Sequence, residues 1–127
     1  MTLKTFLAAL LLIQLTSAQD APSIDGRWRV HSSISGNESD IDCSFSLKDD
    51  AFSGPCTSPR GELQITGKLS GKKLTFQFKT MHDGGELTLV YSGEWSSHEK
   101  FAGSVEVQPL GVSGAFTAAR LESPRKE

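Results

Sequence analysis

The sequence has few of the residues that usually carry catalytic or metal chemistry. It contains two Cys and three His in 127 residues, and His31, His82 and His98 are dispersed rather than spaced as metal ligands. It has no Gly-x-Ser-x-Gly elbow, no His-Glu-x-x-His helix and no Gly-rich phosphate loop. No nucleophile can be matched with a base. We therefore expect a protein that is not an enzyme and that uses neither a metal nor another cofactor.

An excess of charge of one sign is also absent. The chain has 13 Lys and Arg against 15 Asp and Glu, so its formal net charge is −2, and the two signs are mixed along the sequence. Binding to nucleic acid or to an anionic membrane needs a basic cluster. The composition argues against both partners and leaves a small apolar ligand or another exported protein.

Only one long apolar run occurs, and it lies near the N-terminus. Lys4 precedes the run from Phe6 to Leu15, and the small residues at 16–18 follow it, which is the pattern of a secretory signal peptide. The run is shorter than the about 20 residues that span a bilayer. We therefore expect a signal peptide over residues 1–18 rather than a retained anchor, and a secreted or periplasmic protein. Asn37 begins a glycosylation sequon, which matters only in a eukaryotic host.

Helical periodicity is missing from the rest of the chain. From Arg27 to Arg120 apolar and polar residues alternate with a period of two, which is typical of strands with one buried face. Nine aromatic residues occupy apolar positions of this alternation: Trp28, Phe45, Phe52, Phe76, Phe78, Tyr91, Trp95, Phe101 and Phe116. We expect their rings to fill the interior of a closed or nearly closed sheet.

Turn residues divide this region into eight segments. Clusters of Gly, Pro, Asn, Asp and Ser separate residues 26–34, 40–48, 51–57, 61–70, 73–81, 85–95, 100–107 and 111–120. Connections this short join neighbouring strands. The sequence therefore predicts an all-β fold, an eight-stranded antiparallel up-and-down barrel over residues 19–122, followed by a disordered tail at 123–127.

Two-residue turns at Asp49-Asp50 and Gly71-Lys72 fix the registers of two hairpins. The predicted inner-face pairs are Cys43–Cys56, Leu47–Phe52 and Phe45–Gly54 in the first, and Leu69–Leu74, Gly67–Phe76 and Ile65–Phe78 in the second. In both hairpins a Phe ring can cover a Gly across the ladder. Pro55 has no N–H for the ladder, so we expect a bulge or a weak edge there.

Cys43 and Cys56 are predicted to form a disulfide. They lie directly opposite one another in the first hairpin, and an exported protein folds in an oxidising compartment. The alternatives are two free buried thiols or half of a metal site, but no third Cys or His stands at ligand spacing. Closing this loop stabilises a fold by roughly 3 kcal/mol on the chain-entropy model.

Strand direction separates the two ends of the predicted barrel. The lower end collects bulky inner residues, so we expect it to be plugged, whereas the upper end has smaller ones beneath the loops at 35–39, 58–60, 82–84 and 108–110. Eight strands enclose packed side chains or one small ligand. The predicted ligand-binding residues at the upper end are Ser32, Ile34, Leu63, Thr80, His82, Leu87, Tyr91 and Val107.

Two polar turns could be read as functional. Asp49-Asp50 is a pair of carboxylates in sequence, but as the centre of a hairpin turn it is expected to be solvated. His82-Asp83-Gly84-Gly85 is the loop most compatible with a functional role. Its competing interpretation is a hairpin turn with Gly at positions of positive φ.

Gly26-Arg27-Trp28 resembles the Gly-x-Trp signature of the calycins, the lipocalin and avidin-like barrels. In that group an Arg near the end of the last strand covers the Trp, and Arg120 stands at the matching place, which implies a closed end built from Gly26, Trp28 and Arg120. The segment from Thr66 to Gly71 is similar to small exported bacterial barrel modules. The biotin-contact residues of avidins are not matched, so the resemblance implies a fold and no particular ligand.

The sequence leaves two functions open. An exported barrel that binds a small apolar or amphipathic ligand in its upper lumen fits the smaller inner residues there. A solid-core structural or protein-interaction module fits the nine aromatic residues, since each could bury about 150–250 Å² and fill the lumen. Lumen volume separates the two, and it is not a property of the sequence.

Overall fold

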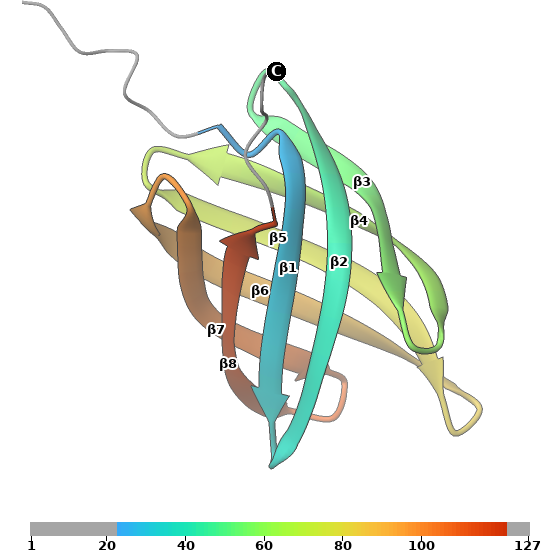
Figure 1. Ribbon diagram of the computed structural model, residues 1–127. Helices are drawn as coiled ribbons and strands as arrows, with labels where there is room; N and C mark the ends of the chain where they lie inside the picture. The colour runs from blue at the N-terminus through green and yellow to red at the C-terminus, as the bar shows by residue number, and fades with distance from the viewer. Residues whose placement is uncertain (1–22, 122–127) are drawn as a thin grey trace, which may run out of the picture.

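The computed structural model describes residues 23–121, and their regular structure consists of eight β-strands. They are β1 (Gly26–Ile34), β2 (Asn37–Lys48), β3 (Ala51–Ser58), β4 (Gly61–Ser70), β5 (Lys73–His82), β6 (Gly85–Ser97), β7 (Lys100–Gln108) and β8 (Val112–Arg120). Each strand pairs antiparallel with the next and β8 pairs with β1, which closes the barrel (Figure 1). The predicted up-and-down barrel is confirmed. The predicted signal peptide and tail lie outside the described residues.

The strand boundaries follow the turn residues closely. Six of the eight strands begin at the predicted residue, and β8 begins one residue late. β2 begins at Asn37 rather than at residue 40, because Asn37–Ser39 continue the ladder against Ser32–Ile34 of β1. The predicted loop at 35–39 is therefore a tight turn at Ser35-Gly36, where the φ angles are 52° and 83°. Between residues 23 and 121 there is no helix long and apolar enough to cross a membrane.

The β2–β3 hairpin has the predicted register. Cys43 faces Cys56 and Leu47 faces Phe52, as the turn at Asp49-Asp50 predicted. The ladder is interrupted at Phe45–Gly54 and at the pair that contains Pro55, and it then resumes without a shift. Of the two outcomes expected at Pro55, the bulge does not form, because no extra residue is inserted, whereas the ladder is locally weakened as the missing N–H predicts. Among the described strands, a register shift occurs instead at Trp95/Ser97, between β6 and β7.

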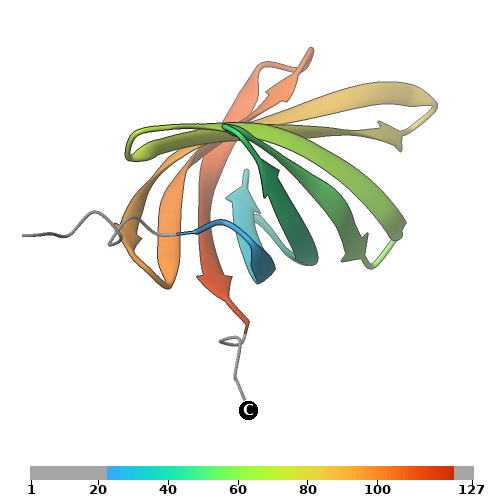
Figure 2. The same ribbon diagram turned by 90° about the horizontal axis from the view of Figure 1, so that it is seen from above.

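The β4–β5 hairpin has the predicted register only near its turn. Gly67 faces Phe76, but the last pair is Thr66–Gln77, so the predicted pair of Ile65 with Phe78 does not form. Beyond that point residues 61–65 of β4 pair with β3, and residues 78–82 of β5 pair with β6. The wall of the barrel thus parts between β4 and β5. Figure 2 shows the strands fanning apart in the view from above.

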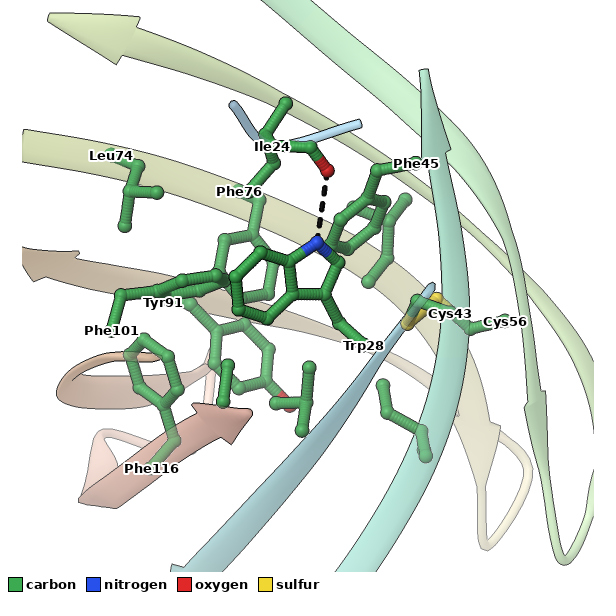
Figure 3. Close-up of a cluster of buried hydrophobic side chains, with 14 of the residues drawn as sticks. Ile24, Trp28, Cys43, Phe45, Cys56, Leu74, Phe76, Tyr91, Phe101 and Phe116 are labelled. Carbon is green, nitrogen blue, oxygen red and sulfur yellow. Dashed lines mark hydrogen bonds between the residues drawn. A yellow bond between two sulfur atoms is a disulfide. The ribbon is translucent and has the colours of Figure 1, made fainter. Parts of the chain in front are cut away.

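Aromatic rings fill the interior, as the alternation predicted. Eight of the nine aromatic residues are buried and Trp95 is half-buried. Phe76 stacks on Tyr91 with ring centroids 4.5 Å apart, near the centre of the cluster in Figure 3. A side chain at Gly67 would collide with the ring of Phe52 and with Cβ of Phe76. This close approach explains why glycine occupies that inner position.

Cys43 and Cys56 form the predicted disulfide. Both residues are buried, and the bond links β2 to β3 beside the interruption in their ladder (Figure 3). The bond is consistent with an oxidising compartment such as the periplasm or the extracellular space.

Candidate functional site

The lower end of the barrel is closed by Trp28 and Arg120. The Arg120 guanidinium carbon lies 4.4 Å from the centre of the Trp28 ring, which is within cation–π distance. Trp28 Nε1 donates a hydrogen bond to the Ile24 carbonyl at 2.9 Å. A Cβ at Gly26 would lie 3.2 Å from Arg120 Nη1, and its φ of 123° also favours glycine. The sequence did not single out Ile24, which is fully buried and adds to this closed end.

The upper end holds a cavity of about 500 Å³, which we call the upper cavity. All eight strands and three of the turns contribute to its lining, so it is the interior of the barrel end rather than a surface depression. Its lining residues are Ile34, Ser35, Asn37, Ser39, Ile41, Ser58, Pro59, Arg60, Leu63, Phe78, Thr80, His82, Leu87, Leu89, Val107, Leu110 and Val112. Eight of the thirteen strand residues among them are apolar. The strands also supply most of the polar groups, namely Asn37, Ser39, Ser58, Thr80 and His82, and the turns add Ser35 and Arg60.

Six of the eight predicted ligand-binding residues line the upper cavity, namely Ile34, Leu63, Thr80, His82, Leu87 and Val107. Ser32 and Tyr91 lie outside its lining, one inner position further along β1 and β6. Both are buried, and their side-chain oxygens are 3.4 Å apart. Burial raises the pKa of the Tyr91 hydroxyl. This pair is therefore satisfied within the core.

Several lining residues were not among the predicted ligand-binding residues. Phe78 and Leu89 have the same inward parity as Thr80 and Leu87, so the alternation contained the signal that would have included them. Arg60 lies in the turn between β3 and β4, where the sequence placed a loop at this end but gave no direction for its side chain.

The upper cavity continues towards the parted wall. Leu63 of β4 and Phe78 of β5 both line it, and they belong to the two strand segments that do not pair with each other. The turns that carry Ser35, Arg60 and Leu110 lie around the same end. The interior is therefore reached where the hairpin tips spread apart, as the sequence predicted for the upper end.

His82 and Arg60 are the ionisable residues among those that line the upper cavity. His82 Nε2 lies 3.4 Å from a carboxylate oxygen of Asp83, whose side chain is 89% exposed in the turn. Asp83 and Gly84 have φ angles of 51° and 80°, so the hairpin-turn interpretation of this loop is confirmed for its backbone. Within residues 23–121 the Arg60 guanidinium has no ion-pair or hydrogen-bond partner.

A second concavity lies on the other side of the sheet, with a volume of about 920 Å³. Its lining comes mainly from exposed Ser, Thr, Lys and Gln side chains of adjoining strands, such as Ser53, Thr66 and Gln77. Although it is larger, it covers one face of neighbouring strands and is not surrounded by the barrel wall. We therefore regard the upper cavity as the better candidate for holding a small molecule, because inner residues from all eight strands line it.

The outer face of β1 and β2 carries a network centred on His31. Its Nδ1 lies 2.6 Å from an Asp40 oxygen and its Nε2 lies 2.6 Å from a Glu38 oxygen. Hydrogen bonds to Asp40 and then to Glu38 raise the pKa of the imidazole. A hydrogen bond from Ser33, followed by that from His31, lowers the pKa of Glu38.

Arg29 and Asp42 extend this face with an ion pair at 2.8 Å. The Arg29 hydrogen bond lowers the pKa of Asp42. No group of three His, Cys, Asp or Glu residues in the described chain is arranged to hold a metal ion.

Comparison with known proteins identifies a fold and no family. The chain is similar to a redesigned β-barrel of known structure, with a TM-score of 0.65 over 78% of this chain and 92% of the other. The chain therefore folds as a small β-barrel. The two sequences are 12% identical, so the likeness concerns the fold alone. No model of a protein family matches the chain, and no curated protein matches it significantly.

Proposed function

We propose that this barrel binds one small apolar or amphipathic molecule in the upper cavity and catalyses no reaction. The observation that carries the proposal is the cavity itself, which is enclosed by strands on several sides and has a volume of about 500 Å³. Ligand sites typically occupy about 300–1,000 Å³ and are lined mainly by apolar side chains. Neither a cofactor nor a second protein is needed for such binding.

The alternative of a solid-core interaction module is less well supported. This alternative was considered because nine aromatic residues could fill the whole lumen. The rings gather instead around Phe76 and Trp28, and this leaves the end near Leu63 and Leu87 unfilled. The filled half acts as a rigid base for the hollow half in this proposal.

The proposed place of action is outside the cytoplasm. The disulfide between Cys43 and Cys56 supports it, since such bonds persist in oxidising compartments. The apolar run at residues 6–15 is the second support. The position of Arg120 over Trp28 also supports a calycin-like barrel, because it is the arrangement that the resemblance implied.

A neutral polarity-sensitive dye, N-phenyl-1-naphthylamine, tests the proposed binding. We expect saturable fluorescence enhancement with one dye per barrel. Leu63→Trp is expected to weaken the dye affinity by about tenfold or more, because the indole takes up part of the space that the dye would occupy. Gln64→Trp is the matched control, since Gln64 is the next residue of β4 and is exposed on the opposite face.

The control variant is expected to bind the dye as the unchanged protein does. The absence of any saturable dye signal would overturn the proposal. Equal binding by the Leu63→Trp and Gln64→Trp variants would overturn it too, because the dye would then be bound elsewhere.

A further inference from the structure

The ionisable groups of the upper cavity are basic, although acidic residues outnumber basic ones in the chain. Arg60 and His82 belong to the lining, and neither Asp nor Glu does, whereas the whole chain has 15 acidic and 13 Lys or Arg residues. Asp83 is close to His82, but its side chain stands in solvent and is not part of the lining. The ionisable side chains of the lining are therefore basic, although the net charge of the chain is negative.

Arg60 is held by its turn while its charged group stays unpaired. Its backbone N–H donates to Ser58 Oγ at 3.1 Å, and Ser58 Oγ donates to the Gly61 carbonyl at 2.8 Å. The backbone of the β3–β4 turn is thus fixed by its own hydrogen bonds. Because the guanidinium has no partner within residues 23–121, it can offer its donors to a ligand oxygen.

Arg60 and His82 stand on the two sides of the parted wall. Arg60 immediately precedes β4 and His82 ends β5, and the adjoining segments of these strands do not pair with each other. Both residues nevertheless line one cavity. The cavity thus has a basic side chain on each side of the gap between these two strands.

The inner part of the cavity suits an uncharged chain. Its walls include Ile41, Phe78, Leu89 and Val107, and none of them offers a charged or hydrogen-bonding side chain. An ion placed there would lose its hydration without gaining a partner, which is strongly unfavourable. A ligand with one charged end would keep that end at the opening and its apolar part inside.

We propose that the upper cavity selects a single-chain amphiphile with an anionic head, such as an alkyl carboxylate, whose head is held by Arg60 and His82 at the gap between β4 and β5. This inference rests on the proposed function and narrows its ligand class. A guanidinium forms bidentate hydrogen bonds with a negatively charged carboxylate, whereas an alcohol carries no charge and an ammonium is repelled.

The experiment compares ligands that have equal tails and different heads. Dodecanoate, dodecanol and dodecylamine, each below its aggregation limit, compete with N-phenyl-1-naphthylamine for the purified protein. We expect dodecanoate to displace the dye at about fivefold lower concentration than dodecanol, with dodecylamine weakest, since exposed ion pairs are worth modest factors. The preference for dodecanoate should shrink as salt is added, because salt screens the attraction.

Arg60→Gln is expected to abolish the preference for dodecanoate over dodecanol. Lys68→Gln is the matched control, because it removes the same charge from an exposed position of β4 outside the upper cavity. It should retain the preference. A urea unfolding midpoint equal to that of the unchanged protein would show that the Arg60→Gln variant is folded.

Two results would overturn this inference while leaving the proposed function intact. One is that the dye binds but dodecanol displaces it as strongly as dodecanoate does. The other is an equal effect of Arg60→Gln and Lys68→Gln on dodecanoate. Failure of the dye to bind at all would instead overturn the proposed function, and the inference with it.

Discussion

At the scale of single residues, the two ends of the barrel differ in what occupies the inner positions. At the lower end Trp28 is fully buried and is covered by Arg120. At the upper end the corresponding positions carry Leu63, Thr80 and Leu87, which are half-buried around open space. Side-chain size along an otherwise regular alternation therefore decides which half of the lumen is filled.

His31 gives the outer face a pH-dependent contribution to stability. Its pKa is raised in the folded state, so this contribution is complete below the ordinary value of 6.5 and is lost as pH rises through the folded value. The pKa of Glu38 is lowered, so its contribution is present above 4.5 and is lost as pH falls through the folded value. The network is expected to stabilise the fold most in mildly acidic solution.

We predict that His31→Gln destabilises the protein most near pH 5–6 and that this destabilisation becomes smaller as pH rises towards 9. Urea unfolding at several pH values measures it. In a Glu38→Gln/Asp40→Asn background the effect of His31→Gln should lose this pH dependence, since the carboxylates that hold the imidazolium are gone. A destabilisation that stays constant from pH 5 to 9 would show that His31 is not charged by its neighbours.

At the scale of strands and turns, short sequence signals determined most of the architecture. Asp49-Asp50 and Gly71-Lys72 are two-residue turns as predicted, so the strands beside them begin and end where expected. The loop predicted at 82–84 is a two-residue turn at Asp83-Gly84, because β5 continues to His82. The alternation of inward and outward positions along each strand then placed the aromatic residues inside. Both signals are local, which is why a single sequence contains them.

The errors at this scale have a common physical cause. Extending the β4–β5 register to Ile65 and Phe78 assumed that the two strands stay together, but they part after Thr66–Gln77. Twist and barrel closure separate strands at one end of a hairpin, and they depend on all eight strands together. For the same reason the sequence did not predict that Arg60 lines the upper cavity, since the closed barrel sets the position of each turn around the opening.

The disulfide is expected to stabilise the β2–β3 hairpin where its ladder is interrupted. Reduction should lower the free energy of unfolding by about 3 kcal/mol, the value for a loop of this size on the chain-entropy model. Urea unfolding with and without reductant measures the change, with the redox state verified by mass. A Cys43→Ala/Cys56→Ala variant should be insensitive to reductant. An unchanged unfolding midpoint after complete reduction would contradict this role.

At the scale of the whole molecule, the protein has a packed half and a hollow half within one closed sheet. The packed half contains the stacked pair of Phe76 and Tyr91 and the Trp28 end. The hollow half is bounded by the hairpin tips and opens where β4 and β5 part. In the proposed function, a ligand would enter at this open end while the packed half keeps its contacts.

The outer concavity is the competing place for a ligand on this molecule. It is larger than the upper cavity and about equally open, but it lies on the outer face among exposed Ser, Thr, Lys and Gln side chains. Apolar molecules gain most where their surface is removed from water. A method that reports residue by residue therefore separates the two places.

An NMR titration with N-phenyl-1-naphthylamine tests the central claim most directly. We predict that the signals of Leu63, Leu87 and Val107 shift in a saturable manner, whereas those of Trp28 and Phe101 at the packed end do not. Shifts confined to Ser53, Thr66 and Gln77 on the outer face, or no saturable shifts at all, would contradict the account.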